Sequence, residues 1–150
     1  VSAPQLWMVS RDSIGSPWKD PVEVVDHECA YPAWAPDGES LVCEAEEGGW
    51  IRISREGEIL QRFDFSTMGL RRVGAPNFSP DGSRIYFHAS PEVGPRGVWW
   101  IPEGGGDATL VVTFDDPSNF MRPFLSVGRE YLYLTIGQTD GDIRVVDLEW

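Results

Sequence analysis

The chain has 150 residues and a formal net charge of −12, from 24 acidic and 12 basic side chains. This length suits one domain with its own core, and the acidic excess disfavours binding to a nucleic-acid backbone. No apolar run approaches the roughly 20 residues of a membrane-spanning helix, and two cysteines with two histidines are too few for a disulfide-rich scaffold or a four-cysteine zinc site.

The N-terminal segment predicts two short β-strands. Apolar residues are concentrated at residues 6–9 and 22–25, and the segment between them is rich in Gly, Pro, Ser and Asp, which favour turns. Both strands resemble the outer strands of a unit that recurs later in the chain, so residues 1–28 are expected to form half of that unit.

A short motif then recurs along the chain. Pro32–Gly38 (Pro-Ala-Trp-Ala-Pro-Asp-Gly) returns 44 residues later as Pro76–Gly82 (Pro-Asn-Phe-Ser-Pro-Asp-Gly), and Pro123–Arg129 is a degenerate third copy. Pro-Asp-Gly favours a turn, because Pro fixes φ, Asp accepts hydrogen bonds from nearby backbone and Gly tolerates positive φ. The aromatic residue before this turn, Trp34 or Phe78, is expected to pack between units.

The same series of strands follows each copy of the motif. Apolar residues alternate in the first strand after the turn, which places them on one face. A glycine-containing turn and another apolar strand come next, and the first two copies add a further turn and a fourth strand. The matching positions are Leu41, Cys43 and Ala45, then Ile85, Phe87 and Ala89, then Leu132, Leu134 and Ile136 in the first strand; residues 50–53, 98–101 and 143–146 in the next; and residues 59–63 and 109–112 in the last.

Units of roughly 40–50 residues with four short strands are typical of β-propeller blades. We therefore expect an all-β partial propeller of about three antiparallel blades. It comprises a half blade at residues 1–28, whole blades at 29–72 and 73–118, and a last blade at 119–150 without its outer strand. A closed ring needs roughly 4–8 blades, so the chain is expected to be the C-terminal part of a longer propeller. Assembly of several copies into a ring and an open array remain alternatives.

The repeat resembles the PD40 repeats, WD40-like units found in TolB-type propellers. The resemblance rests on Pro-x-aromatic-Ser/Ala-Pro-Asp-Gly, the apolar strand after it and the glycine-rich turn, and it covers nearly the whole chain; Val127-Gly128-Arg129 departs from it in the third copy. It implies a non-enzymatic module that binds a protein or ligand in the periplasm or otherwise outside the cytoplasm. The alternatives are the propeller part of a peptidase-like or polysaccharide-active enzyme whose catalytic part lies elsewhere, and a lyase or glycosidase acting at the propeller axis.

Catalytic and metal-binding motifs give no clear signal. The sequence contains no Gly-x-Ser-x-Gly elbow and no phosphate-binding glycine loop. Acidic pairs such as Asp115-Asp116 and Asp140-Gly141-Asp142 lack the spacing of a calcium loop or a glycosidase pair. We therefore predict no cofactor and no metal.

Two further side chains are expected to be structural. His88 shares a strand face with Tyr86 and is expected to be a hydrogen-bonded histidine between blades or at the surface. Cys43 occupies the position of Phe87 and Leu134 in the other units, so a buried free thiol is expected, with a disulfide to Cys29 as the open alternative.

A binding site is expected in the loops that enter the first strand of each blade, because these loops gather at one mouth of a propeller. Tyr and Arg are favoured anchors in interfaces. Self-association through an open blade edge is also expected, since unpaired edges invite pairing. The candidate binding residues are His27, Tyr31, Arg71, Arg72, Asn77, Asn119, Phe120 and Arg122.

Overall fold

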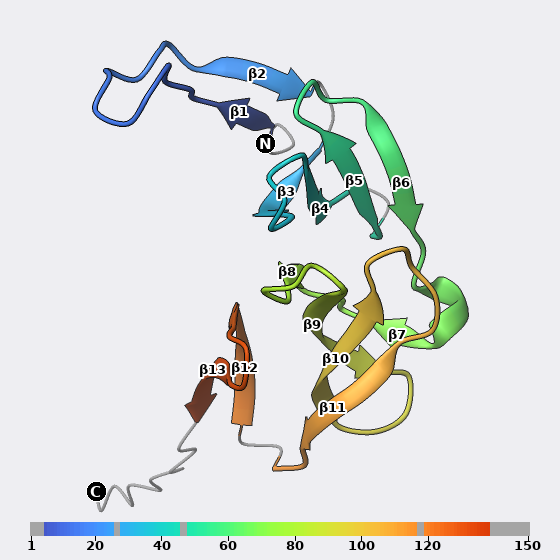
Figure 1. The fold of residues 1–150 in the computed structure, drawn as a ribbon. Coiled ribbons are helices and arrows are strands. Elements are labelled where there is room, and N and C mark those ends of the chain that lie inside the picture. Colours follow the sequence, from blue (N-terminus) through green and yellow to red (C-terminus); the bar gives the residue numbers. More distant parts are fainter. Residues whose placement is uncertain (1–4, 26–27, 46–47, 117–118, 139–150) are drawn as a thin grey trace, which may run out of the picture.

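A computed structural model describes residues 5–25, 28–45, 48–116 and 119–138, with only the backbone described at 119–124 and 138. Apart from one 3-10 turn at Ser66–Met68, its regular elements are β-strands in antiparallel sheets. The sheets follow one another along an arc (Figure 1). The predicted all-β partial propeller is therefore confirmed. No helix in the described residues is long and apolar enough to cross a membrane.

The strands fall into four groups in chain order. The expected third strand of the last blade, residues 143–146, lies outside the described residues. The groups are β1 (Leu6–Met8) with β2 (Val22–Val25); β3 (Ala30–Trp34), β4 (Ser40–Glu44), β5 (Trp50–Ser54) and β6 (Ile59–Phe63); β7 (Leu70–Arg71), β8 (Asn77–Phe78), β9 (Arg84–Pro91), β10 (Arg96–Pro102) and β11 (Thr109–Phe114); and β12 (Asn119–Val127) with β13 (Leu132–Gln138).

The inner strand of the second whole blade is broken into two pieces. Both β7 and β8 pair with β9, and between them the backbone N–H of Gly74 donates to the carbonyl of His88 at 2.8 Å. Pro76 has no N–H to donate, and Arg72 has a φ of 52°. These two residues interrupt the regular ladder just where the chain enters the blade.

In the two whole blades, β3 and β8 lie on the concave side of the arc, and β6 and β11 lie on the outside (Figure 1). The inner strands β3, β8 and β12 lie next to one another, and Figure 1 shows them along the inner side. The outer strands β2, β6 and β11 end their sheets. That the loops entering these strands gather at one mouth of the propeller stays a prediction, because residues 26–27 before β3 and 117–118 before β12 lie outside the described residues.

Two apolar clusters hold neighbouring blades together. The larger joins β3–β6 to β7–β11 around Trp50, whose ring packs edge-on against Phe65 at 4.7 Å and Phe87 at 5.0 Å between centroids. The smaller joins β1–β2 to β3–β6 through Val25, Leu41 and the residues around them. Alternate residues of β4 and β5 thus face opposite neighbours, which explains why both faces of these strands are apolar.

The expectation of a free Cys43 thiol is wrong, because Cys43 forms a disulfide with Cys29 across 14 residues, with Cα atoms 5.3 Å apart. Ala30 pairs with Glu44, which brings the neighbouring cysteines together. Both cysteines are buried in the smaller cluster. The repeat position correctly indicated burial of Cys43, but it carried no information on Cys29, which precedes the motif.

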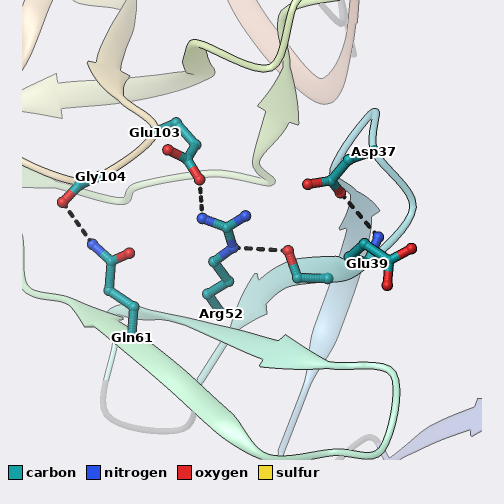
Figure 2. A network of polar contacts seen from close by, with 7 residues as sticks. Asp37, Glu39, Arg52, Gln61, Glu103 and Gly104 are labelled. Atoms are coloured by element: carbon teal, nitrogen blue, oxygen red, sulfur yellow. Dashed lines mark hydrogen bonds and ion pairs between the residues drawn. The ribbon is translucent and has the colours of Figure 1, made fainter.

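A polar network crosses between the two whole blades (Figure 2). Arg52 on β5 donates through Nε to the Ser40 hydroxyl at 2.8 Å and forms an ion pair with Glu103 in the β10–β11 turn. Next to it, Gln61 Nε2 donates to the Gly104 carbonyl at 2.9 Å. The contacts of Arg52 and Gln61 fix the β10–β11 turn of the second whole blade against β5 and β6 of the first, and so orient the two blades.

The two equivalent aromatic residues of the repeat differ in burial. Phe78 packs against the larger cluster, as expected. Trp34 is 49% exposed, so the expectation that it packs between blades is not met in the described residues. Trp34 pairs with Leu41 and shares its face, toward β1 and β2. Those two strands cover Leu41 and leave Trp34 half open.

Candidate functional site

The backbone is unusual at two of the predicted binding residues. Tyr31 has a φ of 50° and Arg72 a φ of 52°, and they are the only non-glycine residues with positive φ in the described part of the chain. Tyr31 lies where the register of β3 against β4 shifts, and Arg72 lies between β7 and β8. A bulky L-residue in this region costs roughly 1–2 kcal/mol. Both inner strands therefore hold an exposed, recognition-type side chain in a strained conformation.

Arg71 and Arg72 border a hollow of about 650 Å³. It lies where the β4–β5 turn of one blade meets the connection from β6 to β7. The floor is apolar and comes from the larger cluster, and the rim is polar and charged. The lining residues are Ala45, Gly48, Gly49, Trp50, Ile51, Arg62, Phe63, Asp64, Phe65, Ser66, Leu70, Arg71, Arg72 and Val73.

The charged groups of the rim differ in whether they already form ion pairs or hydrogen bonds. Arg71 donates to Glu92 Oε1 at 2.7 Å, an exposed pair that contributes little to stability. Hydrogen bonds from Ser66, including its backbone N–H at 2.8 Å, lower the pKa of Asp64, which keeps this carboxylate charged. Arg72 forms no ion pair with any described residue. Arg62, which is also exposed, has no ion pair with a described residue either, so two guanidinium groups beside the hollow are available to a ligand and only that of Arg72 is held at positive φ.

Tyr31 and Asn77 lie on the neighbouring inner strands β3 and β8 and do not line this hollow. Tyr31 is 53% exposed. Asn77 is half-buried, and its Nδ2 donates to the Ala75 carbonyl at 3.1 Å, so its amide is partly used in shaping the strand entry. The exposed Tyr31 side chain is thus accessible to a ligand, whereas the Asn77 amide is used in a hydrogen bond within its own strand entry.

The other predicted binding residues are less well defined. His27 lies outside the described residues. Asn119, Phe120 and Arg122 belong to β12, whose backbone runs beside β8, and their side chains are not described. The structure brings Arg71 and Arg72 together and places Tyr31 one blade away; the binding role of all eight residues stays a prediction.

Sequence reasoning missed Asp64, Ser66 and Arg62 at the hollow. These residues end the outer strand of one blade and begin its connection to the next. Asp-x-Ser is a frequent turn signal, and the predicted order of strands would have placed this connection at the same mouth as Arg71. The sequence-based prediction covered only the residues just before the repeated motif, so this connection was not included.

A second hollow, of about 640 Å³, lies between the Pro-Asp-Gly turn of the second whole blade and the β12–β13 turn. Hydrogen bonds from Ser79 and Ser83 lower the pKa of Asp81 to about 2. Ser79 Oγ lies 2.5 Å from the carboxylate. Asp81 thus closes the turn, as the repeat predicts. Among the described residues, no group of three or more His, Cys, Asp or Glu side chains could hold a metal.

No family model and no curated protein matches the chain. Among solved structures, the putative TolB from Agrobacterium tumefaciens is similar, with a TM-score of 0.53 and 18% identity over 81% of this chain and 47% of that chain. TolB from Acinetobacter baumannii has a TM-score of 0.49 and 22% identity over 69% of this chain and 26% of that chain. The chain has a TolB-like propeller fold. It spans less than half of the length of either TolB structure.

Proposed function

We propose that this TolB-like propeller is a non-enzymatic module that binds a protein partner at the mouth bearing Tyr31, Arg71 and Arg72. The observation that carries the proposal is Arg72, an exposed arginine without an ion pair among the described residues, held at positive φ beside a hollow. Strain of this kind is concentrated at functional sites. Arginine at the edge of an apolar pocket is a frequent anchor in protein interfaces.

The shape of the hollow supports a peptide or loop as the ligand. Its volume suits a few side chains, and its floor includes Trp50, whose indole Nε1 is buried without a hydrogen-bond partner in the described residues. An apolar floor with a charged rim is the usual composition of an interface. Among the described residues, the lining of this hollow contains no histidine and no cysteine.

The exposure of Trp34 supports the proposal that this chain is part of a longer propeller. Phe78, its equivalent in the repeat, packs against the larger cluster that joins its blade to the preceding one, whereas Trp34 lies on the face toward β1 and β2 and is 49% exposed. We propose that the inner strands of a complete preceding blade would cover Trp34, and that the chain divides into blades at about residues 28, 72 and 118. The buried disulfide supports an extracytoplasmic location.

Comparative capture from a periplasmic extract tests the binding role. Arg72→Gly removes the guanidinium while keeping a residue that accepts positive φ, so the fold should be retained or slightly stabilised. Arg55→Ala is the matched control, because Arg55 is an exposed arginine in the β5–β6 turn, away from the hollow. We expect proteins captured by the wild type to be lost with Arg72→Gly and kept with Arg55→Ala. Equal capture by the two variants would contradict this site.

Light scattering after size-exclusion chromatography tests the organisation. If the open flank at Trp34 is normally covered, the isolated chain should associate or aggregate. Trp34→Ser should reduce that association without lowering the unfolding temperature by more than a few degrees, since the side chain is half exposed. A stable monodisperse wild-type monomer would argue against a longer propeller.

A further inference from the structure

The outer strand β11 exposes an apolar edge. Leu110, Val111 and Val112 are 44%, 43% and 37% exposed, and β11 pairs on one side only, with β10. The free side carries backbone N–H and C=O groups that can pair with another strand. Three adjacent apolar residues on such an edge form a surface that is separate from the mouth.

The other outer strands of the described chain carry a charge that β11 lacks. Strand β2 contains Glu23 and β6 contains Arg62, whereas β11 reads Thr-Leu-Val-Val-Thr-Phe. Proteins usually protect edge strands with charged residues, proline or short length. Strand β11, at six residues, has neither a charge nor a proline. Its edge is therefore the best suited of the three to accept an added strand.

Charge at the two ends of β11 indicates which strand would be accepted. Asp107 precedes the strand and Asp115 follows it, and both are exposed. The chain as a whole carries a net charge of −12, which repels a second copy and attracts a basic segment. We propose that β11 binds, by strand addition, an extended peptide of a partner protein that has an apolar stretch flanked by basic residues.

The spacing of the acids sets the dimensions of this ligand. Asp107 and Asp115 are eight residues apart and lie just outside the two ends of β11 (Thr109–Phe114), so their separation is at most about 27 Å. A peptide with Lys or Arg at both ends of a stretch of similar length places one cation near each carboxylate. Its backbone pairs with β11, and its apolar side chains pack beside those of Leu110 and Val112.

A fluorescein-labelled peptide, Lys-Thr-Val-Thr-Val-Thr-Val-Thr-Lys, is a suitable probe in fluorescence anisotropy. Val111→Lys places a charge in the middle of the edge, at an exposed position that does not disturb the core. Leu60→Lys makes the same change on β6, where Leu60 is 55% exposed, and serves as the matched control. Asp107→Asn with Asp115→Asn tests the flanking charges.

We expect the peptide to bind the wild type and Leu60→Lys equally, and Val111→Lys at least roughly tenfold more weakly. The paired Asn substitutions, or Glu in place of the terminal Lys residues, should weaken binding roughly two- to fivefold or more. An N-methylated peptide of equal charge should not bind, and bound peptide should slow amide exchange in β11. Absence of wild-type binding, equal binding of the N-methylated peptide, or an equal loss with Leu60→Lys would each overturn the proposal, and none of them bears on the Arg72 site.

Discussion

The packing of the His88 side chain affects the protonation of its imidazole ring. Its ring lies against Gly74, where any Cβ atom would overlap the imidazole. Its Nε2 is buried and has no hydrogen-bond partner in the described residues. Burial lowers the pKa of His88, and the positive charge of Arg96 lowers it further. The folded protein therefore favours the neutral imidazole.

A pH dependence of stability follows from this lowered pKa. Because the folded state resists protonation of His88, its contribution is complete above the ordinary histidine pKa of about 6.5 and is lost as pH falls through the lower folded value. We compare the free energy of unfolding of the wild type with that of His88→Gln. The difference, wild type minus variant, should decrease as the pH is lowered from about 7.5 to 5. The slope should be a fraction of about 1.4 kcal/mol per pH unit, since the half-buried ring is partly screened by solvent.

Urea unfolding of both proteins at several pH values measures this difference. Burial and the charge of Glu28 raise the pKa of Glu44, which gives a slope of the opposite sign at lower pH, but that contribution is common to both proteins and cancels. A difference that stays constant across the range would show that His88 titrates alike in the folded and unfolded chains.

At the level of residues, prediction from sequence succeeded where the repeat fixes a position. Phe87 and Cys43 are buried, and Asp81 closes its turn. The disulfide of Cys43 and the exposure of Trp34 were not determined by the repeat, because each depends on a residue or strand outside it. The positive φ of Arg72 has no sequence signal at all, since arginine is not a residue that favours this conformation.

At the level of strands and blades, side chains from one blade fix the turns of the next. Arg52 is the centre of such a contact, because it binds both Ser40 within its own blade and Glu103 in the following one. We expect Arg52→Ala to lower the free energy of unfolding by about 1–2 kcal/mol in urea titrations, since it leaves the half-buried Glu103 and Ser40 without their partner. Arg55→Ala removes an exposed 3.6 Å pair with Glu39 and an exposed hydrogen bond to the Gly38 carbonyl, and should cost less, about 1 kcal/mol or below. Equal losses would show that Arg52 does not connect the blades.

The disulfide acts on the same scale, since it ties the entry of β3 to β4. A bond that closes a loop of this size stabilises by about 2–3 kcal/mol. We expect Cys29→Ala with Cys43→Ala to lower the unfolding temperature by roughly 5–10 °C. Both cysteines are buried, so a reductant should act on the wild type only as it unfolds. An unfolding temperature that is the same in the double variant would show that the bond is not formed.

Most strands were predictable from the alternation of apolar residues, and β6 begins and ends as expected. The break between β7 and β8 was not, because it depends on the positive φ of Arg72 as well as on Pro76, and only the proline is visible as a strand-disfavouring residue in the sequence. The hollow beside Arg71 and Arg72 includes residues at this break, so its full lining could not be derived from the repeat alone.

For the whole molecule, stability should be greatest in the middle of the arc. The larger cluster uses both whole blades, with Trp50, Phe87 and Ile101 buried between them. At the far end, Tyr131 and Tyr133 of the last blade are 66% and 67% exposed. Local opening is easiest where few apolar contacts must be broken. The two whole blades are thus expected to unfold together, after the ends of the arc have opened.

Hydrogen exchange followed by mass spectrometry measures this gradient. We expect the slowest amide exchange in β4, β5, β9 and β10, and faster exchange in β1, β2 and β13, because the free energy of local opening follows the buried contacts. Trp50→Ala should remove about 3–5 kcal/mol and abolish the protection of both whole blades together, since the ring contacts each of them. Tyr133→Ala is the control, and it should leave β9 and β10 unchanged. Loss of protection in only one blade of the Trp50→Ala protein would mean that the blades are independent units that merely lie side by side.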